Sequence, residues 1–343
     1  MKNFLLLLIL LPIVTLSQNT DPYRNLVFEG GGTRGLAYAG VIKALDEKGI
    51  LQHIERTAGS SAGAVSALLV SLNYSVEEID SLLNNLDMQS FNDGKWIFVG
   101  GIARMRKNYG WYRGNEFENW IRKIISYKTG KSELSFEELH QLATNDKRFK
   151  EFYCTGTNLS LQRAEVFCYT NTPAMKISTA VRISVSIPLY FGAVFLNEDF
   201  KIVKPNKEKN YTVYVDGGLL ANYPLSVFDS CVSSNHSFIC DSLLPNSSTL
   251  GIKLDRPEQI SAMKGGNNEL AAFKINNARN YVSALYNVLF ETVNRQNKDA
   301  NEKARTIYVS TSNISPRIRK LKAEDKNTLV QNGYKGVQDF FNN

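Results

Sequence analysis

The stretch NLVFEGGGTRGLAYAGVIKALDEKG, residues 25–49, contains the most informative pattern in this chain. Its first four residues, Asn25–Phe28, have the composition of a short buried strand, which the glycines Gly30, Gly31 and Gly32 interrupt. Apolar residues at helical spacing follow as far as Gly49, a residue suited to end a helix. A strand, a glycine-rich turn and a helix in this order predict a unit of an α/β fold with a mostly parallel sheet.

The turn from Gly30 to Gly35 is suited to bind an anion. Glycines allow a sharp turn in which several N–H groups point into one space, and the following helix adds the positive end of its dipole. GxGxxG between a strand and a helix is also the dinucleotide-binding fingerprint, and a plain connection is a third interpretation. A Walker P-loop is excluded because Leu36 and Ala37 stand where Lys and Ser/Thr are needed.

A second strand-to-helix junction contains the pattern Gly-x-Ser-x-Gly. It runs from Gly59 to Gly63 with Ser61 at its centre, between a strand expected over Ile54–Ala58 and an apolar helix expected over Ala62–Leu72. This is the setting of a nucleophile elbow, in which the central Ser adopts strained backbone geometry and small neighbours prevent clashes. Ser61 is therefore the candidate nucleophile.

A third motif, Asp216-Gly217-Gly218, follows a strand expected over Tyr211–Val215. A carboxylate at a strand end can serve as general base for a Ser hydroxyl if it is partly desolvated and within hydrogen-bond reach. An ordinary Asp-Gly turn would have the same sequence. None of the three His residues follows a strand as the His of a hydrolase triad does, so a Ser/Asp pair is the simpler hypothesis.

In this order, the three motifs resemble the patatin-like phospholipase family. The block Ala180–Phe191 and the triplet Asn222–Pro224 are also similar to that family, and the resemblance runs from about Asn25 to the end of the chain. It implies a three-layer α/β/α fold with a mostly parallel central sheet. The sequence contains no internal repeat and no low-complexity linker, which favours one domain over residues 22–343. The resemblance also implies a Ser61/Asp216 dyad with no metal and no other cofactor. The implied oxyanion hole lies in the turn formed by Gly30, Gly31, Gly32, Thr33, Arg34 and Gly35, with the N–H groups of Gly31, Gly32 and Thr33 as its donors.

The function that the resemblance implies is a serine lipid acyl hydrolase of phospholipase A or lysophospholipase type. Its substrate would be a phospholipid or another acyl lipid, at a membrane surface to which the protein binds peripherally. A lipid acyltransferase with the same dyad remains open, because only the acyl acceptor differs. A nucleotide-binding oxidoreductase is disfavoured, because the strand before Ser61 does not end on an acidic residue. Intact Ser61 and Asp216 also disfavour an inactive lipid-binding protein.

The first 17 residues have the pattern of a secretory signal. Lys2 precedes the apolar run Phe4–Leu16, which is too short to span a bilayer. Thr15 and Ser17 are small residues at the positions that a signal peptidase reads. We expect cleavage after Ser17 and export to the periplasm or the exterior.

Export would place the four cysteines in an oxidising environment. Cys231 and Cys240 bracket a polar loop and are the preferred disulfide, whereas Cys154 and Cys168 lie in two expected strands and could face each other across a hairpin. Spacing alone does not choose among the three possible pairings. No Cys/His spacing supports a zinc site.

The composition excludes several classes of protein. Hydrophobic residues make up 43% and charged residues 21%, values that exclude a disordered, collagen-like or coiled-coil chain. The net charge of +7 comes without a dense Lys/Arg stripe, which disfavours nucleic acid and suits an anionic membrane surface. The stretch from Phe91 to Arg113, expected to be irregular, mixes aromatic residues with cations from Trp96 onward. Such a mixture suits contact with lipid headgroups, although aromatic rings packed in the core would explain it equally.

Overall fold

The computed structural model describes residues 23–94, 99–205, 207–232, 242–264, 270–277, 280–281, 284, 288 and 300–342. The expected signal segment, residues 1–17, lies outside this range, as do Trp96, His236 and Cys240. Most of a long helix that the sequence suggests between residues 268 and 304 also lies outside it, although residues 270–277 within that stretch are not helical.

An eight-stranded sheet forms the centre of the fold, in the order β12-β11-β1-β2-β4-β8-β7, with β5 also paired to β4. The strands β12, β11, β1, β2 and β4 are parallel, whereas β5, β7 and β8 join antiparallel. The sheet is therefore mostly parallel, as predicted, and mixed at one side. Its strands are β1 (Asn25–Phe28), β2 (Arg56–Gly59), β4 (Glu151–Asn158), β5 (Arg163–Phe167), β7 (Val194–Leu196), β8 (Thr212–Asp216), β11 (Thr249–Asp255) and β12 (Thr306–Ser310).

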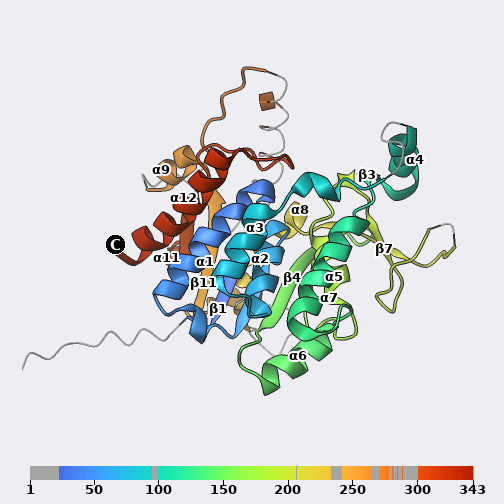
Figure 1. The fold of residues 1–343 in the computed structure, drawn as a ribbon, viewed down its shortest axis with the longest axis horizontal. Helices are drawn as coiled ribbons and strands as arrows, with labels where there is room; N and C mark the ends of the chain where they lie inside the picture. The colour runs from blue at the N-terminus through green and yellow to red at the C-terminus, as the bar shows by residue number, and fades with distance from the viewer. Residues whose placement is uncertain are drawn as a thin grey trace, which may run out of the picture.

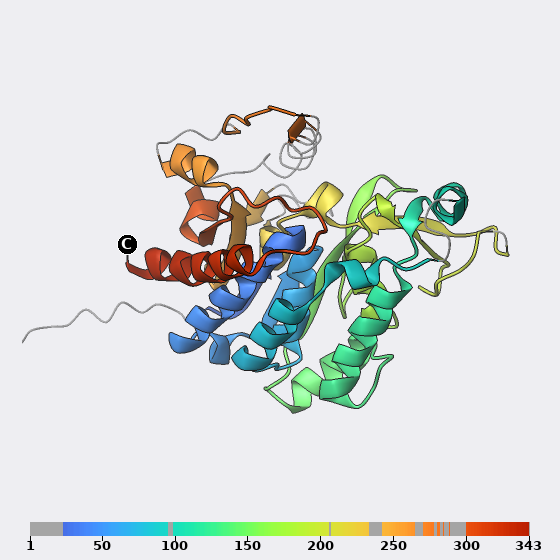
Figure 2. The same ribbon diagram turned by 45° about the horizontal axis from the view of Figure 1, so that its top comes forward.

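Long helices cover one face of the sheet (Figure 1). Leu26 and Phe28 of β1 point into the large apolar core beneath these helices, as alternate residues of a strand do. The helices α1, α2, α3 and α12 lie over this face, and α5, α6 and α7 follow toward β4 (Figures 1 and 2). Their bounds are α1 (Ala37–Glu47), α2 (Ala62–Ser71), α3 (Val76–Asn85), α5 (Asn115–Thr129), α6 (Phe136–Asn145), α7 (Ile177–Ser184) and α12 (Ala323–Asn342).

The opposite face packs against short elements in the described part of the chain. Val27 of β1 and Ala58 of β2 join a smaller core with Leu225 and Phe228. The residues from β8 onward supply most of this covering layer. Its elements are α8 (Gly218–Ala221), η4 (Leu225–Phe228), α9 (Pro257–Lys264) and α11 (Ala300–Ala304), with the hairpin β9 (Ser230–Val232) and β10 (Ser242–Leu244) nearby.

The stretch Phe91–Arg113 is more regular than expected. It contains α4 (Val99–Asn108) and β3 (Gly110–Tyr112), and β3 pairs with β6 (Leu189–Phe191) in a small parallel sheet outside the main one. The expectation of irregular structure was wrong here because β6, distant in sequence, supplies the partner of β3. Short 3-10 turns complete the chain at η1 (Gly32–Leu36), η2 (Leu51–His53) and η3 (Met88–Phe91). No helix within the described ranges is long and apolar enough to cross a bilayer.

The last helix, α12, packs closely along α1. A Cβ atom on Gly333 would lie 2.0 Å from the carbonyl oxygen of Ala37, and one on Gly40 would lie 1.9 Å from that of Val330. Both glycines therefore allow the two helix backbones to approach each other. Gly333 lies inside an unbroken α12, although glycine is a poor helix former.

The cysteines fall into two groups. Cys154 and Cys168 are buried free thiols, so they do not form the alternative hairpin bridge. The register explains this, because β5 places Phe167 opposite Cys154, and a shift of one residue turns a side chain to the other face. Cys231 in β9 is disulfide-bonded. The preferred partner, Cys240, lies outside the described residues.

Candidate active site

Ser61 lies between β2 and α2 in strained backbone geometry. Its φ and ψ angles are 50° and −122°, a combination that costs about 1–3 kcal/mol in a residue with a side chain. Its N–H donates to Ser184 Oγ at 2.9 Å. The neighbouring glycines are required by space, because a Cβ on Gly63 would lie 2.3 Å from the Phe28 carbonyl oxygen and one on Gly59 would meet the Gly63 backbone at 2.4 Å. The turn thus aims the Ser61 hydroxyl away from the sheet.

Asp216, the last residue of β8, accepts a hydrogen bond from the Ser61 hydroxyl. The distance from Ser61 Oγ to Asp216 Oδ2 is 2.9 Å, and the other carboxylate oxygen accepts the Gly218 N–H at 2.7 Å. Gly217 lies directly against Thr155 of β4, where a Cβ would lie 2.2 Å from the Thr hydroxyl. Burial raises the pKa of Asp216 from 3.8 to about 7, although both hydrogen bonds lower it. A carboxylate with this pKa is suited to exchange a proton near neutral pH.

Two peptide units of the glycine-rich turn are held in place by hydrogen bonds to their carbonyl groups. The Gly30 carbonyl accepts from Asn222 Nδ2 at 3.1 Å. The Gly31 carbonyl accepts from both the backbone N–H and the Nε of Arg34, at 3.1 and 3.3 Å. Because the C=O and N–H of a trans peptide point in opposite directions, these bonds orient the N–H groups of Gly31 and Gly32. Within the described residues, neither N–H donates to a protein acceptor.

The other N–H groups of the turn are already used by the protein. Thr33 donates to the Pro316 carbonyl at 3.3 Å, Arg34 donates to Gly31, and Gly30 donates to the Asn222 carbonyl at 2.9 Å. Gly35 lies against Ala62 at the start of α2, where a Cβ would come within 2.8 Å of the Ala62 Cβ. Of the three donors expected for an oxyanion hole, Gly31 and Gly32 are therefore available, and Thr33 and Arg34 instead hold the turn in place.

A segment from the far end of the chain lies on this turn. We call residues 315–321, between β12 and α12, the strap. The Thr33 hydroxyl lies 3.1 Å from the Ser315 carbonyl and 3.2 Å from the Arg317 carbonyl. Gly32, at φ 55°, lies so close to the strap that a Cβ would come within 2.0 Å of the Pro316 oxygen. The strap therefore holds the turn at Gly32 and Thr33, whereas Asn222 holds it at Gly30.

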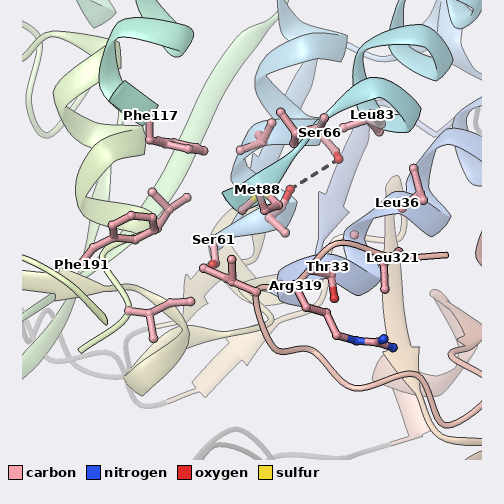
Figure 3. Close-up of a pocket in the computed structure, with 18 of the residues that line it drawn as sticks. Thr33, Leu36, Ser61, Ser66, Leu83, Met88, Phe117, Phe191, Arg319 and Leu321 are labelled. Atoms are coloured by element: carbon pink, nitrogen blue, oxygen red, sulfur yellow. Dashed lines mark hydrogen bonds between the residues drawn. The ribbon is translucent and has the colours of Figure 1, made fainter. Parts of the chain in front are cut away.

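Ser61 opens into a pocket that encloses about 780 Å³, part of it continuous with solvent. Figure 3 shows Ser61 between Phe191 on one side and Thr33 on the other, while the guanidinium of Arg319 points away from Ser61. The walls are mostly apolar, with few polar groups apart from those around Ser61. The apolar lining comprises Leu36, Val65, Leu83, Leu86, Met88, Phe117, Val185, Ile187, Phe191, Ile318 and Leu321. Such a pocket suits a hydrocarbon chain bound beside a polar reacting group.

A buried charged network supports the turn, and our sequence reasoning missed it. Glu29 precedes the glycines and is 2% exposed, and its carboxylate accepts the Leu254 N–H at 2.7 Å and lies 3.4 Å from Asn222 Nδ2. Lys253 of β11 is fully buried, with its Nζ 4.0 Å from Glu29 and 5.0 Å from the centre of the Tyr223 ring. The acidic residue directly between a buried strand and a glycine turn was the signal that could have identified Glu29.

The described His side chains are bonded elsewhere. His140 in α6 pairs with Glu151 and stacks on Tyr169 at 3.8 Å, and His53 lies at the end of η2 beside Gln52. Among the residues that the structure describes, no cluster of His, Cys, Asp or Glu is arranged to hold a metal ion. Among the described side chains, Asp216 is the one that accepts a hydrogen bond from the Ser61 hydroxyl.

Comparisons with known proteins identify relatives by sequence and solved structures with a similar fold. An uncharacterized protein of Acanthamoeba polyphaga mimivirus is 28% identical over 207 residues, which cover 60% of this chain and 61% of the viral protein. A probable lipid hydrolase of Invertebrate iridescent virus 6 is 25% identical over 206 residues, covering 60% of this chain and 63% of that protein. The chain thus spans about three fifths of the length of these two relatives.

Among solved structures, VipD from Legionella pneumophila has a similar fold. Its TM-score is 0.62 at 16% identity, and the match covers 94% of this chain and 67% of VipD. At this identity the likeness concerns the fold alone. The family model for patatin-like phospholipases matches residues 26–229, a range that contains both Ser61 and Asp216. The chain therefore belongs to the patatin-like phospholipase family.

Proposed function

We propose that this protein is a serine lipid acyl hydrolase of phospholipase A or lysophospholipase type, with Ser61 as nucleophile and Asp216 as base. The observation that carries the proposal is the 2.9 Å hydrogen bond from Ser61 Oγ to a buried carboxylate, at the edge of an apolar pocket. Family membership and the probable lipid hydrolase among the relatives support the assignment of lipid as substrate.

The proposed reaction is acyl transfer in two steps. Ser61 Oγ attacks the ester carbonyl carbon while Asp216 accepts the hydroxyl proton, and the tetrahedral oxyanion binds the N–H groups of Gly31 and Gly32. The proton passes from Asp216 to the leaving alcohol, which departs as a lysolipid or similar product. Asp216 then takes a proton from water, whose oxygen attacks the acyl-enzyme and releases the fatty acid.

The apolar walls would bind the acyl chain. A Leu- and Phe-lined pocket offers a hydrocarbon chain the free energy of leaving water, about 0.8 kcal/mol for each buried CH₂ group. Ser61 and the N–H groups of the glycine turn lie at one side of this mostly apolar lining, which would place the ester there and the chain along the apolar walls.

The decisive experiment compares Ser61→Ala with the unsubstituted protein on phospholipid, lysophospholipid, triacylglycerol and a short-chain ester. We expect Ser61→Ala to lower the rate of fatty acid release by more than about 10³-fold, because the nucleophile is lost. Ser66→Ala is the matched control, since Ser66 lines the same pocket one turn further along α2 and bonds only the Ala62 carbonyl, at 3.5 Å.

Product analysis distinguishes the hydrolase from an acyltransferase with the same dyad. Free fatty acid as the main product supports the hydrolase, whereas an acylated alcohol formed in the presence of an acceptor lipid would favour the transferase. Unchanged hydrolysis by a folded Ser61→Ala protein would refute both.

We further propose that residues 1–17 direct export to the periplasm or exterior. The apolar run after Lys2 supports this, and so does the disulfide at Cys231, because such bonds persist in oxidising compartments. The N-terminal sequence of protein recovered outside the cytoplasm would test it. A terminus at Gln18 is expected, and an intact Met1 would contradict the proposal.

A further inference from the structure

A group of elements at the β7 edge of the main sheet leaves large apolar side chains exposed at one end of the molecule. We call α4, β3, β6, β7 and the loop 197–211 the end lobe, and Figures 1 and 2 both show α4, β3 and β7 at this end. Tyr109 is 50% exposed and Leu189 is 65% exposed, and Ile102 and Ile202 are also exposed. Tyr109 packs against Phe195 on one side, with ring centres 5.7 Å apart, and leaves the rest of its ring exposed.

Two of these side chains also sit on strained backbone. Tyr109 has φ 58° and Leu189 has φ 68°, in the left-handed region that disfavours residues with a Cβ atom. They are neighbours, because β3 and β6 place Gly110 opposite Leu189. Asn or Gly at either position would relieve the strain and remove the exposed apolar surface together. A partner that buries both side chains would offset both costs.

The end lobe is also rich in cations. Lys201 pairs with Asp199 at 3.5 Å, and the other exposed basic side chains outnumber the acidic ones. In the described part of the lobe, the exposed cations are Arg106, Lys107, Lys201, Lys204, Lys207 and Lys209, against the acids Glu198, Asp199 and Glu208. This excess of positive charge is complementary to an anionic surface.

The exposed pair lies next to the pocket of Ser61. Ile187 and Phe191, two residues on either side of Leu189, both line that pocket. Tyr190, between them, is held by a hydrogen bond to Asn92 at 2.7 Å. A surface in contact with Leu189 is therefore close to the pocket wall.

We infer that the end lobe docks on an anionic lipid bilayer, with Tyr109 and Leu189 inserted at the headgroup level and the cations against lipid phosphates. Aromatic and apolar side chains with basic neighbours suit this boundary. The inference rests on the proposed function, because docking here would bring acyl lipids to the pocket at Ser61. Binding itself requires no hydrolysis and can be measured separately.

The test is sedimentation with vesicles of phosphatidylcholine, with and without phosphatidylglycerol, using the full chain carrying Ser61→Ala so that no lipid is consumed. We expect tighter binding when phosphatidylglycerol is present, weakened by added salt. Leu189→Asn in this background should bind about tenfold more weakly, since an exposed Leu no longer inserts. Its melting temperature should stay equal or rise, because Asn tolerates the left-handed region.

Two further variants complete the test. Tyr127→Ser is the matched control, because Tyr127 is 72% exposed near the opposite end of α5 from β3, and its binding should not change. Combined Lys204→Gln, Lys207→Gln and Lys209→Gln should lower affinity about tenfold or more, and only for vesicles with phosphatidylglycerol.

The inference would be overturned if neither Leu189→Asn nor the lysine variants weaken vesicle binding. It would also be overturned if the protein does not bind vesicles at all, which is the result expected if the end lobe binds a protein instead. The function is judged separately, by hydrolysis of a water-soluble short-chain ester with Ser61 intact. Loss of vesicle binding with that activity retained in Leu189→Asn would support the docking surface, whatever lipid the enzyme prefers.

Discussion

Burial of the Asp216 carboxyl group suits its proposed role as a base but lowers the stability of the folded protein. This burial raises the pKa of the carboxyl group to about 7, and the Gly218 N–H and Ser61 hydroxyl offset only part of the effect. Above that pH the folded protein holds an ionised carboxylate where burial disfavours charge. In the unfolded chain the same group ionises near 3.8 at no such cost. This residue therefore makes the folded state less stable as pH rises from about 4 to about 7.

Asp216→Asn should abolish hydrolysis and stabilise the protein at alkaline pH. Because the pKa is higher in the folded state than in the unfolded one, the folded state binds more protons between these values, and its stability falls as they dissociate. The substitution should raise the free energy of unfolding at pH 8 by up to about 4 kcal/mol, with little gain near pH 4. Urea unfolding across this range measures it.

The matched control for this prediction is Asp199→Asn, since the Asp199 side chain is 72% exposed and pairs only with Lys201 at 3.5 Å. It should change the free energy of unfolding little at any pH. A gain for Asp216→Asn of the same size at pH 4 and pH 8 would show that ionisation of a buried carboxylate is not the cause.

Asn222 positions the glycine turn and is expected to act through it. The Asn222 side-chain amide donates to the Gly30 carbonyl, and the Asn222 backbone carbonyl accepts the Gly30 N–H. Asn222→Ala would remove the first bond and so free the Gly30–Gly31 peptide unit, which carries the Gly31 N–H. Loss of one oxyanion donor typically lowers kcat about 10²–10³-fold. We expect a loss in this range with KM nearly unchanged, in steady-state assays on a short-chain ester. Asn197→Ala, in the loop after β7, is the control, and an equal loss there would contradict the role.

At the scale of elements, the strap is held to η1 through one side chain. The Thr33 hydroxyl lies within 3.2 Å of two strap carbonyls, while its N–H bonds a third. A hydroxyl in this place joins segments that are 282 residues apart in sequence. The element that completes one wall of the pocket thus depends on a small number of polar contacts.

Thr33→Val should loosen the strap while preserving the shape of the side chain. The single hydroxyl proton that these two carbonyls share would be lost, which we expect to lower the free energy of unfolding by about 1–2 kcal/mol. Amide hydrogen exchange in residues 315–321 should become faster, and Thr33→Ser should restore most of the protection. Equal exchange in Thr33→Val and the unsubstituted protein would contradict this account.

At the scale of the whole molecule, the family match ends at residue 229, but the sheet does not. β11 lies between β1 and β12, so residues after the match complete the sheet beside the glycine turn. α12 then returns across α1 and covers the largest core cluster. The two ends of the folded chain are therefore joined in one packed unit.

Gly333→Ala should weaken this junction. A Cβ there would lie 2.0 Å from the Ala37 carbonyl oxygen, so α12 would have to move away from α1. Overpacking of this kind outweighs the about 1 kcal/mol that Ala gains over Gly in a helix, and we expect a net loss of about 2 kcal/mol. Thermal and urea unfolding would measure it. Gln331→Ala, on the exposed side of the same helix, is the control, and equal stability of the two variants would refute the close packing.

Local sequence patterns predicted the elements that carry the proposed chemistry. The features that they missed depend on contacts between residues far apart in the sequence. β1 has the expected bounds, because a short apolar run before turn residues is a strong strand signal. β11 was missed because Gly251 and Lys253 interrupt its apolar pattern. A buried Lys is acceptable there beside Glu29 and Glu302, which are both far away in sequence. Likewise, nothing in the sequence around Thr33 indicates that its N–H donates to the Pro316 carbonyl.

The strap has a consequence for the order of events during synthesis. The chain emerges from the ribosome N-terminus first, so Ser61 and the glycine turn exist long before Pro316 and the strap are made. Until those last residues arrive, the turn lacks the contacts that hold Thr33, and the pocket lacks Ile318 and Leu321. A nascent or C-terminally clipped chain that lacks the strap would therefore hold Ser61 and Asp216 without these contacts, and we expect the proposed hydrolysis to require the strap.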